Sequence, residues 1–494
     1  MRSPGWADLF AWQVDRASGT PLFRQVYLQI RAAIVSRTLA PGLRLPSTRE
    51  LASRLRMART SVISAYEQLL AEGYVAGKAR SGTFIAFDLP APTEKRAPER
   101  VARPIAKVPS VSVRGKALEH VRAFTAESDA RPFNMGRTRV DARTVEAWRK
   151  LTHQAVRTLG PLHLGYSDPR GLPELRQTLC DYLRAARAVR CEPEQIIVTG
   201  GTQPAIDLAI RVLLDRDAEV WVEDPCYPVT YYALATAQVR IRPIPVDAQG
   251  LNVGAGLQRA PKARAAFVTS SHQFPLGVAL TMPRRLALLT WARETGSWII
   301  EDDYASEFRY SGRPLASLQG LDDAGRTIYI GTLNKALFPG LRMGYLVVPQ
   351  SLLRAFVSAR YLIDRQPSSL NQTVVAEFMR QGYFAAHIRR TRLQYRDQRD
   401  GLVAELTRRA GDNLTIDVPD QGMHLLAYLR HRLSDVEIEQ AASQCGVIVR
   451  AIHPMYKKAR ARSGLMLGFS GFPLEAIVPA AARLAALVAR RVRV

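Results

Sequence analysis

Apolar residues recur at helical spacing in three segments near the start of the chain. The first pattern begins at Pro21 and ends before Pro41-Gly42. The second begins at Pro46–Thr48, where Ser47 can cap a helix, and the third runs from about Arg59 to Glu72. Because only a short turn separates the last two, the pattern predicts a helix-turn-helix.

Two short strand-like runs follow the third helical segment. Tyr74-Val75 and Thr83–Ala86 flank a turn that holds Lys78 and Arg80. This arrangement predicts a two-stranded β wing with a basic tip. We therefore expect residues 1–87 to form a small winged helix-turn-helix domain.

Residues 88–117 lack a helix or strand pattern. Five prolines lie between Pro90 and Pro109, interleaved with lysines and arginines and with few large apolar residues. Such a segment is typical of an extended, self-repelling linker.

From about residue 118 to the end, apolar strand-like runs alternate with amphipathic helical segments. This alternation predicts an α/β domain built on an open sheet. The expected strands are residues 195–199, 219–223, 239–243, 265–269, 298–301 and 327–330, with helices such as 172–186, 203–214 and 284–295 between them. A smaller α+β subdomain is expected from about 385 to 494, with strands at 414–418, 424–429, 447–449 and 465–469.

Composition adds a preference for polyanionic partners. The 494 residues include 69 Lys+Arg and 44 Asp+Glu, a formal net charge of +25, which favours nucleic acid. No signal-peptide pattern and no apolar run as long as a membrane span is present, so a soluble, cytoplasmic protein without membrane contact is expected. The four cysteines lack metal or disulfide spacing and are interpreted as reduced thiols.

One lysine stands out as a candidate for covalent chemistry. Lys335 follows the apolar run Thr327–Ile330 in a predicted loop, and it is the only lysine between Lys262 and Lys457. The chain otherwise uses arginine for positive charge, so a lysine here is expected to be needed for its amine. A partly buried lysine with a cationic neighbour such as Arg342 forms Schiff bases with aldehydes.

Three other motifs fit an aldehyde cofactor that carries a phosphate. The pattern of Val198–Ala205 predicts a strand, a glycine turn and the start of a helix. Backbone N–H groups and hydroxyls at such a helix start can bind a phosphate. A carboxylate pair, Asp302 and Asp303, ends a buried strand, where an aspartate can keep a ring nitrogen protonated, and Tyr227 lies on a constrained turn as a stacking face. Together with Lys335, these are the parts that pyridoxal 5′-phosphate requires.

The first 87 residues resemble the winged helix-turn-helix domain of GntR-type regulators. The resemblance is carried by Leu45–Leu55, Ala58–Leu69, Glu72–Val75 and Ser81–Ala86. It implies binding to a double-stranded DNA operator, with the family's contacts at Arg44, Arg49, Arg59, Ser61 and Gly82. The helix starts and the wing add the polar groups Ser47, Thr48, Thr60, Lys78 and Arg80 as further candidates.

Residues 118–494 resemble fold-type I aminotransferases. The matching motifs are Leu164–Arg176, Thr199–Gln203, Asp224–Tyr227, Glu301–Tyr304 and Gly331–Lys335. The resemblance implies that Lys335 forms the internal aldimine, that Asp302 pairs with the pyridine nitrogen and that Tyr304 lies by the phenolic oxygen. It also implies stacking by Tyr227, a phosphate site at Gly201, Thr202, Gln203, Thr332 and Arg342, and a domain-swapped homodimer in which Tyr166 reaches the partner's phosphate.

The whole chain resembles the MocR-type regulators, which join these two domains. Two departures from active aminotransferases are visible: Phe274 replaces the asparagine of Asn-Pro-x-Gly, and Met466 replaces the carboxylate-binding arginine, for which Arg450 is the nearest substitute. The resemblance implies a regulator that senses an amino compound or a vitamin B6 species. An active aminotransferase tethered to DNA, and a vestigial cofactor site, remain as alternatives.

Overall fold

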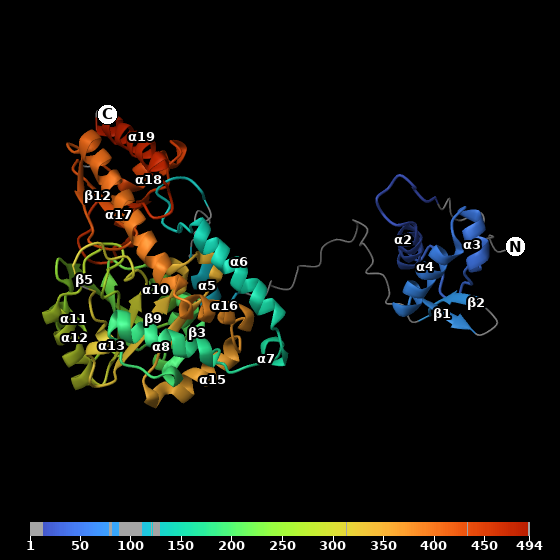
Figure 1. Cartoon of the computed structure of the whole chain (residues 1–494), viewed down its shortest axis with the longest axis horizontal. Coiled ribbons are helices and arrows are strands. Elements are labelled where there is room, and N and C mark those ends of the chain that lie inside the picture. Colours follow the sequence, from blue (N-terminus) through green and yellow to red (C-terminus); the bar gives the residue numbers. More distant parts are fainter. Residues whose placement is uncertain are drawn as a thin grey trace, which may run out of the picture. The chain divides into compact units, whose positions relative to one another are not determined.

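The structure is a computed structural model that describes residues 13–78, 82–87, 111–119, 121, 129–312, 314–431 and 433–492. The chain divides into two compact units, residues 1–109 and 110–494, which are drawn together in Figure 1. Each unit is described by itself.

The first unit is the expected winged helix-turn-helix. Ser47 caps its second helix, as the sequence predicts, because the Ser47 hydroxyl accepts a hydrogen bond from the Glu50 N–H at 3.2 Å. A single apolar core formed by residues such as Val26, Ile30, Val62 and Leu69 holds the helices together. The elements are α2 (Leu22–Val35), α3 (Thr48–Arg54), α4 (Arg59–Ala71), β1 (Val75–Lys78) and β2 (Gly82–Ile85).

The second unit is built around an eight-stranded mixed sheet. Its strand order is β3-β10-β9-β8-β7-β4-β5-β6, with parallel pairing from β9 through β5 and antiparallel pairing of β10 with both neighbours. The strands are β3 (Ile196–Thr199), β4 (Glu219–Asp224), β5 (Arg240–Asp247), β6 (Gly250–Leu251), β7 (Ala265–Val268), β8 (Trp298–Asp303), β9 (Thr327–Thr332) and β10 (Gly344–Val347).

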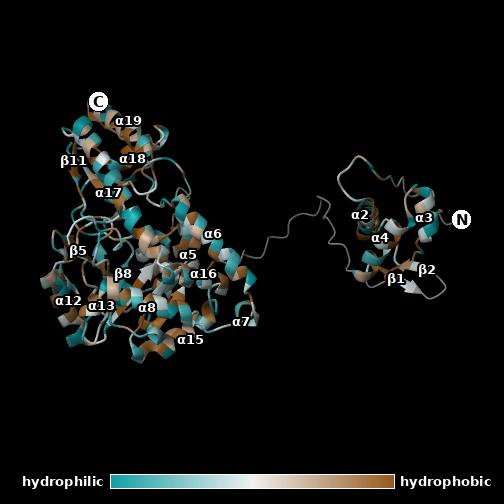
Figure 2. Ribbon diagram, viewed as in Figure 1, coloured by the Kyte–Doolittle hydropathy of each residue, from teal (hydrophilic) through white to brown (hydrophobic). Residues whose placement is uncertain are grey.

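Helices cover both faces of this sheet, which explains why its central strands read as continuous apolar runs. All six residues of β9 are buried, and Figure 2 shows hydrophobic colour along the strands at the centre of the unit. The helices are α5 (Val113–Glu119), α6 (Ala142–Arg157), α7 (Pro161–Leu164), α8 (Pro173–Arg187), α9 (Thr202–Leu213), α10 (Pro228–Thr236), α11 (Val253–Arg259), α12 (Met282–Thr295), α13 (Leu318–Leu321), α14 (Leu333–Ala336), α15 (Leu353–Ile363) and α16 (Ser369–Arg380).

The end of the chain forms the smaller subdomain, an antiparallel sheet of order β11-β12-β14-β13 with three helices. Its elements are α17 (Tyr383–Ala410), β11 (Leu414–Asp417), β12 (His424–Leu429), α18 (Asp435–Gln444), β13 (Arg450–Ala451), β14 (Gly464–Gly468) and α19 (Leu474–Val492). The strand expected at residues 447–449 is wrong, and the paired residues are those of β13. Val447–Val449 is apolar because it is buried, and the Ile448 N–H bonds the Pro132 carbonyl instead of a neighbouring strand.

A close backbone approach links three strands at the edge where the candidate site lies. Gly344, at the start of β10, is so near the turn after β3 that a Cβ on it would lie 3.0 Å from the Gly201 Cα and from the Gly331 carbonyl oxygen. Strand β10 was absent from the expected elements, yet it brings the glycine turn beside the segment that carries Lys335. Lys335 itself lies in the one-turn helix α14, whereas the sequence suggested a loop.

None of the helices in the described part of the chain combines the length and the apolar character that crossing a membrane requires.

Candidate functional site

A cavity of about 220 Å³ lies at the carboxyl ends of β8 and β9, beneath the smaller subdomain. Its walls come from both parts of the second unit. From the residues singled out in the sequence, it brings together Thr202, Gln203, Tyr227, Phe274, Asp302, Tyr304, Thr332, Lys335, Arg342 and Arg450. Its other lining residues are Met135, Gly136, Pro228, Thr269, Asn334, Pro339, Met423, His424 and Met455.

The helix that carries Lys335 is fixed by two polar side chains. The Thr332 hydroxyl caps α14 by accepting a hydrogen bond from the Asn334 N–H at 3.2 Å. The Asn334 side chain in turn accepts from the Met343 N–H at 2.8 Å, which ties α14 to the start of β10. Sequence reasoning missed Asn334, because an asparagine in a predicted loop carries no signal of a tertiary contact.

The structure separates the roles of two neighbouring acids at the end of β8. Asp303 does not line the cavity, and its Oδ2 accepts hydrogen bonds from Arg187 Nε and Tyr329 Oη, both at 2.7 Å, while its Oδ1 has no partner in the described residues. Asp302 lines the cavity, and its buried Oδ1 has no hydrogen-bond partner in the described residues. Burial, with the nearby charges of Asp303 and Glu223, raises the pKa of Asp302 to about 7.

Other polar atoms at the cavity also lack partners within the described residues. Tyr304 Oη and Gln203 Nε2 are both buried and without a hydrogen-bond partner there. Burial beside Asp302 raises the pKa of Tyr304 well above its ordinary value, so its hydroxyl stays protonated. Because buried polar groups are normally satisfied, Asp302, Tyr304 and Gln203 together indicate a polar ligand that presents a cation to Asp302.

The opposite end of the cavity is suited to an anion. Gly201 precedes α9 with φ +115°, and the first backbone N–H groups of α9 belong to Thr202 and Gln203, which line the cavity. A Cβ at Gly201 would lie 2.9 Å from Asn334 Nδ2 and 3.8 Å from the Arg342 guanidinium. Only a glycine therefore leaves room here, in a cradle formed by a helix start and a guanidinium. The residues present fit pyridoxal 5′-phosphate: an amine for its aldehyde, an acid for its ring nitrogen and a cradle for its phosphate.

Phe274 and His424 close the cavity next to Lys335. His424 is almost fully buried, and its Nε2 lies 3.1 Å from the Pro275 carbonyl oxygen, so this nitrogen donates the hydrogen bond. Burial, reinforced by the charge of Lys335, lowers the pKa of His424 to about 4, although the bond to Pro275 opposes the shift. Sequence reasoning did not identify His424, because a histidine at the start of a strand has no distinguishing pattern.

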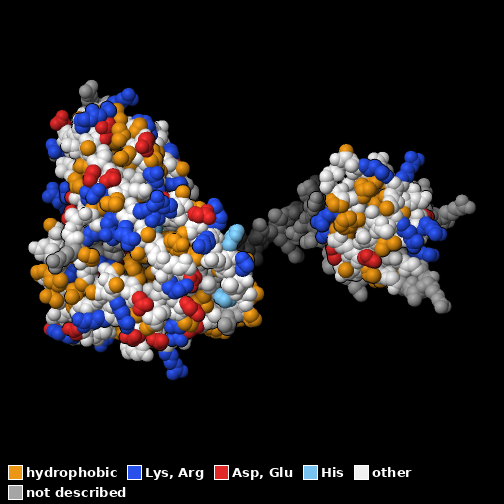
Figure 3. Space-filling view, in the orientation of Figure 1, with side chains coloured by type: hydrophobic (Ala, Val, Ile, Leu, Met, Phe, Trp, Pro, Cys, Tyr) orange, Lys and Arg blue, Asp and Glu red, His pale blue; other side chains and the backbone are white. Residues whose placement is uncertain are grey.

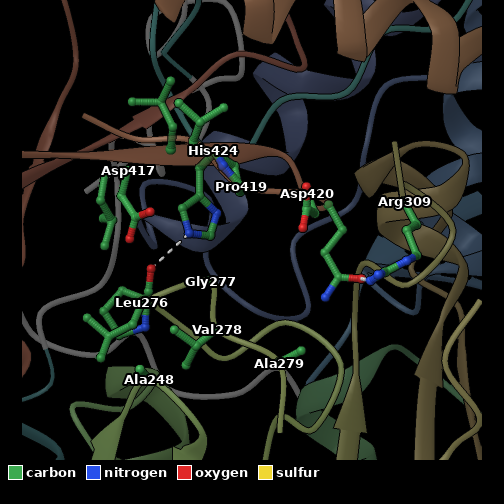
Figure 4. A pocket seen from close by; sticks show the side chains of 15 residues that line it. Ala248, Leu276, Gly277, Val278, Ala279, Arg309, Asp417, Pro419, Asp420 and His424 are labelled. Carbon is green, nitrogen blue, oxygen red and sulfur yellow. Dashed lines mark hydrogen bonds between the residues drawn. The ribbon is translucent and has the colours of Figure 1, made fainter. Parts of the chain in front are cut away.

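A second cavity, of about 230 Å³, lies on the other side of His424 (Figure 4). It is formed by the loop Pro275–Ala279, Arg309 and residues 417–426 of the smaller subdomain. Figure 4 shows the His424 ring between Asp417 and Asp420, with its bond to the loop below. This cavity has no lysine among its lining residues, so the aldehyde chemistry belongs to the cavity that contains Lys335.

Arg450 and Met466, the two residues considered for the carboxylate-binding position, lie on neighbouring strands. In the smaller sheet, Arg450 of β13 pairs directly with Met466 of β14. Arg450 also lines the cavity. Arg450 thus reaches the cavity from the strand next to Met466.

Two expected cofactor contacts, Gly201 and Tyr166, are not among the residues that line the cavity; Gly201 adjoins it at the start of α9, whereas Tyr166 lies on the surface of the single chain. Tyr166 is 80% exposed and stacks against the Arg365 guanidinium, whose carbon lies 4.3 Å from the ring centre. Arg365 also lies over Tyr361, at 5.0 Å. Tyr166 therefore belongs to an exposed surface on this side of the second unit.

In the first unit, the expected DNA contacts cluster around the starts of α3 and α4 and the wing. The Arg59 Nε donates to the Thr48 hydroxyl at 3.3 Å, and the Arg44 guanidinium lies against Gly82, which has φ +107°. Arg49 and Thr60 are exposed and Ser61 is half-buried. The Lys78 side chain and Arg80 lie outside the described residues. Figure 3 shows Lys and Arg side chains distributed over the visible face of each unit.

Comparison with protein families identifies both units. Residues 132–465 match the model "Aminotransferase class I and II", and residues 22–85 match "Bacterial regulatory proteins, gntR family". The fold agrees with a kynurenine aminotransferase of Pyrococcus horikoshii solved with PMP, at a TM-score of 0.70 and 25% identity, over 77% of this chain and 97% of that one. The aminotransferase class and the geometry of the cavity together give pyridoxal 5′-phosphate as the cofactor.

Two curated relatives share both units in the same order. The chain is 38% identical over 458 residues to the probable rhizopine catabolism regulatory protein MocR of Rhizobium meliloti, covering 93% of this chain and 92% of that protein. It is 31% identical over 461 residues to the pyridoxine biosynthesis transcriptional regulator PdxR of Corynebacterium glutamicum, covering 91% and 92%. The chain therefore belongs to the MocR-type family of pyridoxal 5′-phosphate-dependent transcriptional regulators.

Proposed function

We propose that this protein controls transcription in response to an amino compound or a vitamin B6 species that reaches the cofactor at Lys335. The observation that carries the proposal is Asp302, whose buried Oδ1 has no hydrogen-bond partner in the described residues and which lines the same cavity as Lys335. A winged helix precedes this cavity in the chain. The unit that binds a small molecule and the unit that binds DNA are therefore one polypeptide.

Each residue at the cavity has a distinct task in this proposal. The cofactor supplies an aldehyde, which exchanges reversibly between primary amines. Lys335 anchors that aldehyde, Asp302 keeps the ring nitrogen protonated, and Tyr304 donates a hydrogen bond to the phenolic oxygen. Tyr227 stacks on the ring, and the phosphate is held by Gly201, Thr202, Gln203, Thr332 and Arg342.

Two substitutions favour sensing over turnover. Phe274 places a ring where aminotransferases have an amide that bonds the cofactor oxygen, and a phenyl ring cannot donate that hydrogen bond. Arg450 replaces the usual arginine from a neighbouring strand, which alters the direction from which an effector carboxylate is held. The alternative is an aminotransferase tethered to DNA, which requires sustained product formation from the same cavity.

The response is proposed to arise from a shift between two arrangements of the second unit. The cavity is lined by both the large domain and the smaller subdomain, so an effector that contacts both walls stabilises the arrangement in which they are close. That arrangement then determines how the winged helices of a dimer are presented to an operator.

A homodimer is supported by an exposed apolar patch next to Tyr166. The patch consists of Leu164, Tyr166, Tyr361, Leu362 and Ile363, and Leu362 is 82% exposed in the single chain. Exposed patches of this kind mark protein interfaces. In the proposed dimer, Tyr166 reaches the cofactor phosphate of the partner subunit, as in a domain-swapped arrangement.

Replacing Lys335 by alanine should abolish the absorbance of the covalently held cofactor, because no other lysine lines the cavity. Lys262→Ala, at an exposed lysine, is the control and should keep the absorbance. In the wild type, an effective amino compound should change the spectrum stoichiometrically and shift operator affinity. Sustained turnover with amino donors and 2-oxoglutarate, at about 1 s⁻¹ or faster, would overturn the regulatory proposal in favour of the tethered enzyme.

Replacing Asp302 by asparagine should stabilise the cofactor-free protein at alkaline pH. Because the folded-state pKa of Asp302 is raised to about 7, its stabilising contribution is present below the unfolded pKa and is lost as the pH rises through 7. Asparagine does not ionise, so the variant should melt roughly a few degrees above the wild type at pH 8 and close to it only near pH 4, at about the unfolded pKa of an aspartate. It should also bind the cofactor more weakly. Asp215→Asn, at an exposed acid, should change neither property, and matched pH profiles for Asp302→Asn and wild type would refute the assignment.

Arg49→Ala and Arg59→Ala should each weaken operator binding by about 1–3 kcal/mol. If the lost contact is to a phosphate, the plot of log affinity against log salt concentration should become shallower, with its negative slope reduced in magnitude by about 0.9. Arg24→Ala removes the same charge from an exposed position on α2 and should bind nearly as the wild type does. Gel shifts over a salt series measure both quantities, and unchanged affinity and slope in the two variants would exclude these contacts.

Leu362→Glu should raise the dissociation constant of the dimer by about tenfold or more, because it places a charge in the apolar patch. Leu286→Glu, at an exposed leucine of α12, is the matched control. Analytical ultracentrifugation measures the constants. A monomeric wild type, or equal constants in both variants, would show that this patch is not the interface.

A further inference from the structure

The segment Ile452–Ser463, between β13 and β14, forms part of the roof of the cofactor cavity. Arg450, just before it, and Met455, within it, both line the cavity. Its later part is fixed to its own subdomain, since the Arg462 guanidinium carbon lies 3.5 Å from the centre of the Tyr428 ring. The middle of the segment, Lys457–Ala459, leaves the smaller subdomain and contacts the large domain.

One carboxylate holds the middle of this segment to the large domain. Asp224 is 1% exposed, and its Oδ1 accepts a hydrogen bond from the Lys457 N–H at 2.7 Å. Its Oδ2 accepts from the N–H groups of Lys458 and Ala459, at 2.7 and 2.6 Å. Hydrogen bonds to an ionised acceptor are about twice as strong as neutral ones. Three of them on one carboxylate therefore fix the backbone of the segment.

The same contact extends to the wall that carries Tyr227. Asp224 ends β4, and Tyr227 follows three residues later as the residue that starts α10. The Lys457 ammonium lies 4.6 Å from the centre of the Tyr231 ring, one turn into α10. Asp224 thus sets the distance between Tyr227 on one wall of the cavity and Arg450 with Met455 on the other.

We propose that Asp224 is a positioning residue that holds Lys457–Ala459 against the large domain and so keeps the effector side of the cavity closed. Releasing this carboxylate frees the segment without removing any group that lines the cavity. The part of this inference that concerns the effector rests on the proposed function. The part that concerns the contact between Asp224 and Lys457–Ala459 is independent of it.

The first measurement is limited trypsin digestion of the full-length protein, with cleavage after Lys457 and Lys458 followed by mass spectrometry. Both side chains are exposed while their backbone N–H groups are held, so cleavage reports how often the segment opens. In Asp224→Asn, an amide NH₂ group replaces one of the two accepting oxygens. We expect cleavage at these two bonds to become about tenfold faster.

Asp322→Asn provides the matched control for this measurement. Asp322 also accepts two backbone hydrogen bonds, from Ala324 at 2.9 Å and Arg326 at 2.6 Å, but on a different loop. It should leave cleavage after Lys457 and Lys458 unchanged. Because Asp224 is buried, Ala459→Pro serves as a second variant that removes one donor from the other side of the contact. Trypsin does not cut a Lys–Pro bond, so this variant is scored only at the bond after Lys457, where cleavage should also become faster.

The second measurement uses hydroxylamine, which needs no knowledge of the effector. Its nitrogen attacks the carbon that joins the cofactor to Lys335, and the Lys335 amine leaves. We expect the absorbance to decay about tenfold faster in Asp224→Asn than in the wild type, with the initial absorbance per chain unchanged.

An unaltered cleavage rate in both Asp224→Asn and Ala459→Pro would overturn the inference, as would equal acceleration at cleavage sites throughout the chain. A wild type without cofactor absorbance would refute the proposed function, and the trypsin result would still decide the role of Asp224.

Discussion

Asp302, whose buried Oδ1 has no hydrogen-bond partner among the described residues, is the constraint around which the second unit is arranged. Burying an unpaired charge is unfavourable, and a protein normally avoids it by pairing the group or by keeping it protonated. At the end of β8 the chain does both, because Asp303 is paired with Arg187 while Asp302 is left with a pKa of about 7. The first acid gives the sheet edge a rigid polar network, and the second is held ready for a cation that the protein does not supply.

The anion cradle depends on the same sheet edge through backbone contact. Gly201, Gly331 and Gly344 lie on adjacent strands or their ends, and a Cβ on Gly331 or Gly344 would collide with the neighbouring strand or turn. This close approach places the start of α9 next to α14. The backbone contact at Gly344 and the side chains packed against Gly331 and Gly201 together fix these segments next to one another, which favours a preorganised site.

The effector side of the cavity is built differently. Arg450, Met423 and Met455 belong to the smaller subdomain, and the contact at Asp224 joins it to the large domain. One wall of the cavity therefore belongs to the sheet of the large domain, and the other belongs to the smaller subdomain, which is joined to the large domain at Asp224. Such a site is suited to a ligand-dependent change in how the two parts are arranged.

The sequence by itself determined the elements and the chemistry that local patterns carry. The helix cap at Ser47, the apolar strand before Lys335 and the glycine turn at Gly201 depend on neighbours in the chain, so periodicity and residue type were sufficient for them. Tertiary structure alone decided which of two adjacent acids faces the cavity, because Asp302 and Asp303 differ only in partners that are distant in sequence. It also decided the pairing of Arg450 with Met466, the insertion of β10 between β3 and β9, and the three hydrogen bonds at Asp224. These contacts join segments separated along the chain, and no local pattern records which distant residues the fold brings together.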